Sequence, residues 1–272
     1  MTTVIRPKRS PWDINLHDLW RSRELLFVFV WRDIKVRYRQ TFLGIAWVLF
    51  QPVVTTAVFS IFFGKLAKIP SGDLPYPLFS FSSLILWNFF SGGLTLASNS
   101  VVLMGPVIKK IYFPRLFIPL SAVLTSVVDF FVSLIPLILM FIYYRIIPSP
   151  LLILFLPLLL FMLSLNTLGL GLFLATLNVR YRDIRFLVPF FVQIGIFVTP
   201  VIYPLSIIYD YRKWFLIANP LTGIFETFRT LVAGSNNIDF GLVLISLLIT
   251  LIVFTFGLFY FSRSEDNFAD YV

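Results

Sequence analysis

Long apolar runs dominate the pattern of hydrophobic and polar positions along this chain. A helix needs roughly 20 residues to cross a hydrocarbon core of about 30 Å, and six runs reach or approach that length. In chain order they are about Gly44–Phe63, Tyr76–Leu103 (interrupted by Asn88 and the Gly92-Gly93 pair), Leu116–Ile142, Leu151–Leu177, Phe186–Tyr203 and Phe240–Phe261. Continuous runs favour helices over the alternating strands of a barrel. The pattern therefore predicts an all-α membrane protein with six transmembrane helices.

Residues 16–40, which precede the first run, follow a different pattern. Their apolar stretch Leu25–Trp31 is too short to cross a membrane, and apolar residues recur at helical spacing among Arg and Lys. A basic helix that carries Trp and Phe is typical of one lying in the plane of the membrane interface. We therefore expect an amphipathic interface helix that anchors the first span. An additional docking role for this helix stays open.

Residues 204–233 form the second unusual segment. They are too many for a tight turn and too apolar for a solvated loop. Asn219-Pro220 divides the segment, because Pro cannot continue a helix and disfavours helix in the residue before it. The segment predicts two outer re-entrant half-helices, with a plain outer loop as the alternative. Glu226 and Arg229 are spaced to form a local pair.

Composition supports a membrane location, and charge gives its orientation. The chain is 58% hydrophobic and 13% charged, with a mean hydropathy of +0.91, whereas soluble domains carry about 25% charged residues. Sixteen of the 22 Lys and Arg residues flank the runs on the side of the N-terminus. Basic residues accumulate on the cytoplasmic side of short loops. We therefore expect an inner-membrane protein with both termini in the cytoplasm. The orientation of the spans explains the net charge of +9, so the charge does not indicate nucleic-acid binding.

The sequence offers little material for catalysis. It has no Cys, a single histidine (His17), no glycine-rich phosphate loop and no cluster with metal-ligand spacing, so we expect no catalytic, cofactor-binding or metal site on this chain. Asp129 is the exception, because a carboxylate in the middle of a span is a functional candidate by default. With no second intramembrane acid and no intramembrane Lys or Arg, we expect a structural hydrogen bond and no proton relay.

The cytoplasmic loop 104–119 combines charge with exposed apolar residues. Lys109 and Lys110 stand beside Ile111, Tyr112 and Phe113. Charge alone is explained by a turn that orients the neighbouring spans. An exposed Ile-Tyr-Phe cluster next to it indicates a docking surface for a partner.

Four segments resemble a known family. They are "WRDIKVRYRQTFLGIAWVLFQP" (31–52), "KKIYFPRLFIPLSAVLTSVVDF" (109–130), "LNVRYRDIRFLVPFFVQIGIFVTPVIYP" (177–204) and "NPLTGIFETFR" (219–229). In this order they are similar to the transmembrane permeases of type-2 ABC exporters, in the subgroup that exports O-antigen and related polysaccharides. Residues 1–40 would then be a cytoplasmic N-terminus with the interface helix, and 41–272 the six-helix permease domain.

The resemblance implies three functional surfaces on this chain. An ATPase-coupling helix at 104–113 would include Lys109, Lys110, Ile111, Tyr112 and Phe113. A second cytoplasmic contact would include Arg180, Tyr181, Arg182 and Asp183. An outer gate would include Trp214, Asn219, Pro220, Glu226 and Arg229.

The resemblance also implies partners and an activity. The permease would form a homodimer, pair with two separate ATP-binding-cassette ATPase subunits that hold ATP and Mg, and move a lipid-linked polysaccharide across the inner membrane. The permease itself would then be no enzyme. Alternatives are an exporter of another lipid, teichoic acid, a drug or haem. A membrane glycosyl or acyl transferase would need clustered His or carboxylates. An ion-driven flippase would show paired intramembrane charges or two repeated halves. This sequence has none of these patterns.

Overall fold

The fold is a bundle of helices, described here from a computed structural model for residues 16–39, 46–207, 219–265 and 268. No strand occurs within these ranges. The helices in chain order are α1 (Leu16–Arg21), α2 (Arg23–Arg39), α3 (Ala46–Phe59), the π-helix η1 (Ser60–Leu66), α4 (Tyr76–Leu103), α5 (Gly105–Ile108), α6 (Phe117–Tyr144), α7 (Leu151–Arg180), α8 (Ile184–Val198), α10 (Leu221–Val232) and α11 (Phe240–Ser264).

Five helices are long and apolar enough to cross a membrane in the described part of the chain: α3 with η1, α4, α6, α7 and α11. Their bounds agree with five of the predicted spans to within a few residues. The helix α4 is continuous through Asn88 and the Gly92-Gly93 pair, where the apolar pattern is interrupted. The backbone hydrogen bonds of a helix are internal, so polar or small side chains in an apolar run need not break it.

The predicted span Phe186–Tyr203 differs from the structure. Its helix, α8, has 15 residues and ends at Val198, which gives a length of about 22 Å at 1.5 Å per residue. Residues 199–203 turn away from the helix axis. Pro200 accounts for the early end of the helix, because proline disfavours helix in the residue before it and Thr199 is accordingly extended. The backbone that follows binds a buried arginine, described below.

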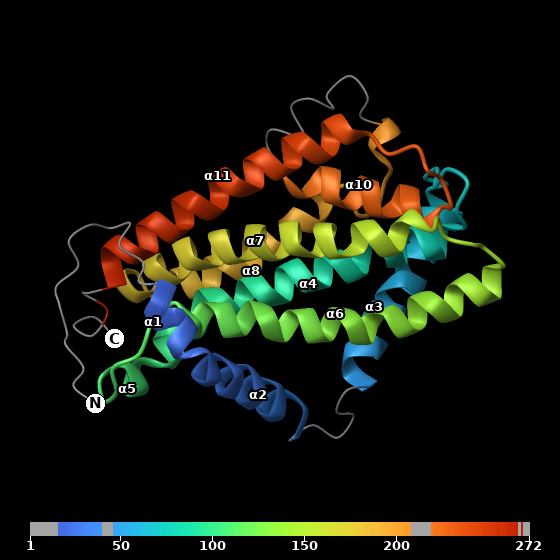
Figure 1. The fold of residues 1–272 in the computed structure, drawn as a ribbon. Coiled ribbons are helices and arrows are strands. Elements are labelled where there is room, and N and C mark those ends of the chain that lie inside the picture. The colour runs from blue at the N-terminus through green and yellow to red at the C-terminus, as the bar shows by residue number, and fades with distance from the viewer. Residues whose placement is uncertain (1–15, 40–45, 208–218, 266–267, 269–272) are drawn as a thin grey trace.

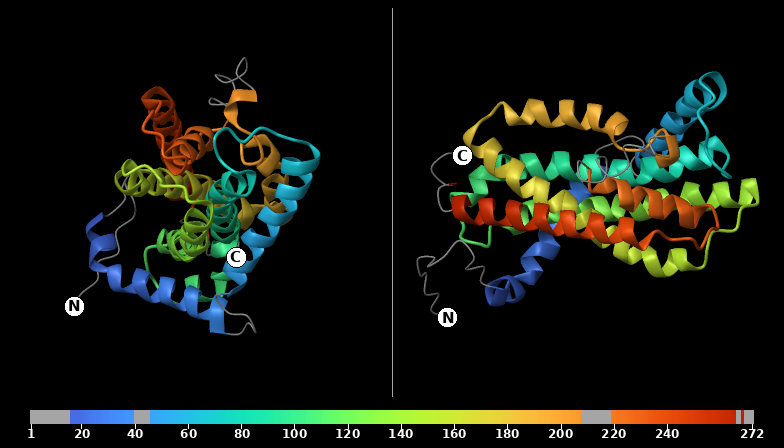
Figure 2. Two further views of the ribbon diagram at one scale, coloured as in Figure 1. Left: turned by 90° about the vertical axis from the view of Figure 1, so that its right-hand side faces the viewer. Right: turned by 90° about the horizontal axis from the view of Figure 1, so that it is seen from above.

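The helix α4 is the centre of the bundle. It packs against α3, α6, α7, α8 and α10, and most of its side chains are buried. The long helices α4, α6, α7 and α11 run side by side, with α10 between α7 and α11 (Figure 1). The end-on view in Figure 2 shows α2 across the bundle from α11. By contrast, α3 and α8 leave broad apolar faces exposed.

Small residues allow α7 and α11 to approach closely. A Cβ added to Gly257 of α11 would lie 1.9 Å from the carbonyl oxygen of Gly169 in α7. Such contacts between small residues are a common means of packing helices in membranes, where lipid is as apolar as the side chains. The helix α11 begins after Asp239, whose side chain accepts a hydrogen bond from the Leu242 amide at 3.1 Å.

Candidate functional site

The connection between α4 and α6 (residues 104–116) is the first candidate site. It lies at the left-hand end of the bundle in Figure 1, together with the end of α7 and the start of α8. Only one helical turn, α5, forms in it before the chain becomes extended. Lys109 and Lys110 are exposed, and Ile111 and Tyr112 have exposed fractions of 62% and 73%. These four consecutive residues are therefore an exposed surface at this end of the bundle.

Phe113 does not belong to this exposed surface, so the expected Ile-Tyr-Phe cluster is wrong for its third member. Its exposed fraction is 6%. The ring packs edge-on against Phe29 of α2, with 5.3 Å between the ring centroids. Phe113 therefore holds the connection to α2, while Ile111 and Tyr112 stay outside.

Polar contacts reinforce the attachment of α2. The Arg32 guanidinium donates to the Met104 sulfur at 2.9 Å, and Ser121 of α6 donates to the Asp33 carboxylate at 3.1 Å. Further along, Arg37 forms an ion pair with Asp129, and the Tyr38 hydroxyl donates to the same carboxylate. The helix α2 is thus joined both to the α4–α6 connection and to the first half of α6.

Asp129 accepts a hydrogen bond, as expected, but its ion pair with Arg37 was not predicted. The spans themselves contain no Lys or Arg that could pair with Asp129. Its cationic partner, Arg37, comes from α2, which precedes the first span. Phe29, Asp33 and Arg37 follow one another at intervals of four residues, which places them on one helix face. That spacing was the available signal, and nothing in the sequence says which helix faces it.

A hollow of about 230 Å³ lies within the α4–α6 connection, lined by residues 108–113 and Arg115. One terminal nitrogen of Arg115, Nη1, is buried and has no hydrogen-bond partner among the described residues. Together with Lys109 and Lys110, it makes the hollow basic. The arrangement favours an acidic group on any molecule that docks here.

The predicted second contact, Arg180 to Asp183, is the exposed turn between α7 and α8. The Arg180 guanidinium lies over the Tyr181 ring at 5.5 Å. The Asn178 amide fixes this end of α7 to α4 by donating to the Ser98 carbonyl at 2.9 Å and to the Asn99 side chain at 3.0 Å. The turn and the α4–α6 connection are therefore presented at the same end of the bundle.

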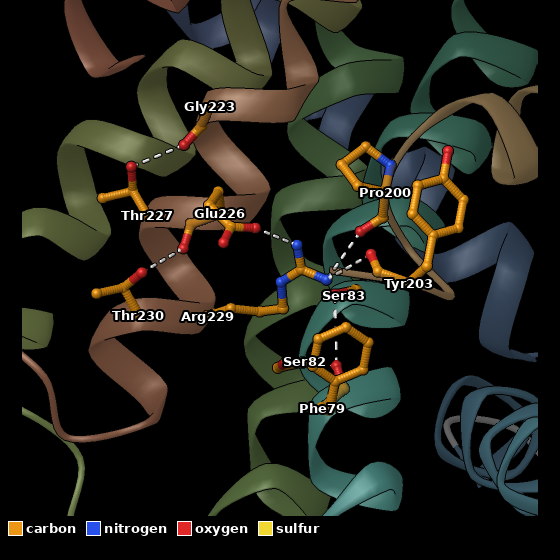
Figure 3. Close-up of polar contacts among 10 residues, drawn as sticks. All are labelled: Phe79, Ser82, Ser83, Pro200, Tyr203, Gly223, Glu226, Thr227, Arg229 and Thr230. Atoms are coloured by element: carbon orange, nitrogen blue, oxygen red, sulfur yellow. Dashed lines mark hydrogen bonds and ion pairs between the residues drawn. The ribbon is translucent and has the colours of Figure 1, made fainter. Parts of the chain in front are cut away.

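The opposite end of the bundle contains the second candidate site, a buried arginine (Figure 3). Arg229 of α10 has an exposed fraction of 4%. It forms the predicted pair with Glu226 and donates to the carbonyl oxygens of Pro200 at 3.0 Å and Tyr203 at 3.2 Å. Its guanidinium carbon lies 4.5 Å from the centre of the Phe79 ring. One side chain thus joins α10, the turn after α8 and the start of α4.

The electrostatics of this cluster follow from its burial. Burial disfavours the charge of the Arg229 guanidinium, and the Glu226 carboxylate offsets part of that cost. A buried charge is stable only when it is paired and its donors are used. The carbonyl oxygens of Pro200 and Tyr203 accept hydrogen bonds from the guanidinium nitrogen Nη1, which does not bind the Glu226 carboxylate. The turn after α8 and the Arg229 side chain therefore stabilise each other.

Asn219 and Pro220 begin α10 as the sequence predicts. The Asn219 side chain accepts from the Leu221 amide at 3.1 Å and donates to the Thr199 hydroxyl at 2.6 Å. Pro220 precedes the first helical residue, Leu221. The second of the two predicted half-helices is thus present and buried against α4, α7 and α11. Trp214 and the first half-helix lie outside the described residues.

Comparisons with known proteins agree with one another. The sequence signature described as "ABC-2 type transporter" matches residues 24–233. The chain is 30% identical over 220 residues to the O-antigen export system permease protein RfbA of Myxococcus xanthus, covering 79% of this chain and 83% of that protein. It is 27% identical over 248 residues to a Klebsiella pneumoniae protein of the same name, covering 91% and 94%.

Replacing Arg229 tests the buried cluster. A lysine carries one compact charge and cannot bind Glu226, two carbonyls and a ring at once. We expect Arg229→Lys to lower the free energy of unfolding by about 1–3 kcal/mol, measured as a lower melting temperature in detergent. Arg145→Lys, at an exposed site near the same end, is the matched control and should leave the melting temperature unchanged. Equal melting temperatures for the two variants would contradict this role.

The Arg37–Asp129 pair is tested by a double-mutant cycle. Asp129→Asn leaves a half-buried cation without its counter-charge, so it should destabilise the protein by about 1–3 kcal/mol. Arg37→Gln combined with Asp129→Asn should recover part of that loss, because no unpaired charge remains. Asp73→Asn, on an exposed loop residue, is the control. Additive effects of the two single changes would show that the residues do not act as a pair.

Proposed function

Because this chain belongs to the ABC-2 type transporter family, we propose that it is the membrane-spanning subunit of an ATP-driven exporter that moves O-antigen, a lipid-linked polysaccharide, across the inner membrane. The observation that carries this proposal is the similarity to O-antigen export permeases along 91% of the chain. The chain is a multi-pass permease, and ATP hydrolysis belongs to a separate ATPase subunit that binds ATP and Mg. The sequence has no glycine-rich phosphate loop, which supports the assignment of ATP binding to another subunit.

The end of the bundle that carries the α4–α6 connection and the α7–α8 turn faces the cytoplasm in this proposal. It holds Lys109, Lys110, Arg115, Arg180 and Arg182, in keeping with the enrichment of basic residues inside. Both termini then lie in the cytoplasm. The fifth predicted span in chain order crosses the membrane as α8 together with the turn that follows it, since α8 alone is shorter than the other spans.

The ATPase subunit docks on this cytoplasmic end. Ile111 and Tyr112 provide an exposed apolar pair, and the basic hollow beside them provides charge. An aromatic residue flanked by cations is typical of the residues that contribute most to protein interfaces. The exposed turn 180–183 gives a second contact. The exposed apolar faces of α3 and α8 are suited to a homodimer that encloses the substrate path. Each copy of the chain then binds one ATPase subunit.

Transport follows from a shift between two states of the bundle. Closure of the ATPase pair on ATP pushes the α4–α6 connection, and α2 moves with it because Phe29, Arg32 and Arg37 attach α2 to that connection and to α6. At the outer end, α10 and the turn 199–203 form the gate. Arg229 holds these two parts together, so opening the gate displaces them as one unit.

Changing the exposed pair tests the docking surface. Ile111→Asp combined with Tyr112→Asp should reduce co-purification of the ATPase subunit and transport by roughly tenfold or more, since loss of a central interface contact costs about 2 kcal/mol. Membrane insertion and melting temperature should not change, because both side chains are exposed. Ile147→Asp, with an exposed fraction of 85% at the outer end, is the matched control. Unchanged co-purification and transport would sink the docking role.

The substrate is tested with the co-expressed permease and ATPase in proteoliposomes. A lipid-linked polysaccharide should stimulate ATP hydrolysis and appear in the lumen, whereas the same lipid without its glycan should do neither. Stimulation by a drug or by haem, with no response to any glycolipid, would refute the polysaccharide assignment and leave the family membership intact.

A further inference from the structure

A cavity of about 250 Å³ lies where α2, α3, α4 and α6 meet. It is separate from both the docking surface and the Arg229 cluster. Arg37 of α2 and Asp129 of α6 stand at one side, and Trp47 and Gln51 of α3 at another. Asn88, Ser91 and Gly92 of α4 line the wall between them.

The glycines of α4 give independent evidence that this space is open. A Cβ added to Gly92 would meet no atom within 4 Å, whereas one added to Gly93 would lie 2.9 Å from the Thr167 methyl group. The two neighbours thus point into different surroundings, one empty and one filled. A glycine in the middle of a helix costs about 1 kcal/mol relative to alanine, and packing between protein helices does not explain its presence at position 92.

Two amides in the cavity have unused hydrogen-bonding groups. Asn88 is half-buried near the middle of α4, and its side chain has no hydrogen bond to another described residue. Gln51 is exposed on α3, and its side-chain amide also has no hydrogen bond to another described residue. An unpartnered amide in an apolar setting costs free energy, and each amide offers both donors and an acceptor. A ligand that can donate and accept from the same position would satisfy both.

The charges in the cavity narrow the class of ligand. Arg37 is the one cation in the described lining, and it is already paired with Asp129. A phosphate would have to compete with that carboxylate and would meet its repulsion. A lipid tail would leave both amides unsatisfied. A neutral polyhydroxylated ring avoids both penalties, because its hydroxyl groups donate to the carboxylate and accept from the guanidinium and the amides.

The aromatic wall fits the same class. Trp47 and Phe89 both line the cavity, and Trp47 stacks on Phe50 with 5.7 Å between the ring centroids. An aromatic face packs well on the C–H side of a sugar ring, while the polar groups opposite bind its hydroxyls. Pockets that combine apolar walls with a few placed polar groups are typical of small-ligand sites.

We propose that this cavity is a saccharide-binding site that holds one sugar residue of the lipid-linked polysaccharide. The proposal rests on the proposed function for the identity of the natural ligand, but the site itself is defined by the residues of one copy of this chain. Trp47 provides the stacking face. Asn88 and Gln51 bind ring hydroxyls, and the Arg37–Asp129 pair fixes the orientation of the ring at the polar edge.

The site is tested by direct binding, with no ATPase present. The purified chain in lipid nanodiscs is titrated with the octyl glycosides of glucose, galactose, mannose and N-acetylglucosamine, with octyl phosphate and octanol as comparators. At least one glycoside should bind saturably. Its Kd should rise tenfold or more in Gly92→Leu, which fills the open space, and stay within twofold in Gly92→Ala, which adds one methyl group to it.

A second variant protects the test against a folding defect. Asn88→Leu keeps a similar volume and removes the amide, so it should raise the same Kd roughly tenfold. Melting temperatures identify any variant that fails to fold. Binding of octyl phosphate or octanol in place of every glycoside would overturn the proposal, as would glycoside binding that neither Gly92→Leu nor Asn88→Leu weakens. Glycolipid-stimulated ATP hydrolysis without such binding would remove this site and leave the proposed function standing.

Discussion

A buried guanidinium joins three helical segments at the end of the bundle that carries α10. Lipid offers no hydrogen-bond partners, so each backbone group that leaves a helix within the membrane needs a partner from the protein. Arg229 meets that need for the carbonyls of Pro200 and Tyr203, and Glu226 balances its charge. These contacts join α10, the turn after α8 and the first turn of α4.

The half of the bundle that carries the α4–α6 connection is organised by a different attachment. The helix α2 lies against α6 and is joined to it and to the α4–α6 connection by Phe113, Met104, Ser121 and Asp129. The same helix therefore touches the surface proposed to receive the ATPase and the cavity proposed to receive a sugar. An interface helix that only anchored the first span would need none of these polar contacts. Its position instead links the docking surface and the cavity through one rigid element.

Unused polar groups and unused space mark the places where partners belong. Ile111 and Tyr112 are exposed beside an arginine nitrogen that lacks a partner among the described residues. Asn88 and Gly92 face open space in the middle of an otherwise buried helix. These two features differ in chemistry, since the first is basic and the second is a neutral mixture of amides, hydroxyls and an ion pair. They accordingly suit an acidic protein surface and a saccharide.

The sequence by itself determined the helices and the local pairs. The length of each apolar run sets where a spanning helix begins and ends, so α4, α6, α7 and α11 lie close to their predicted bounds. The Glu226–Arg229 pair and the start of α10 after Pro220 follow from spacing along one segment. The end of α8 at Val198 also follows from the chain, because Pro200 disfavours helix in Thr199. Only tertiary contacts decided that Phe113 is buried and that Asp129 has a cationic partner. Each of these depends on a contact between distant segments, such as Arg37 and Asp129 at 92 residues apart, and hydrophobic periodicity specifies which face of a helix is buried without specifying which other helix covers it.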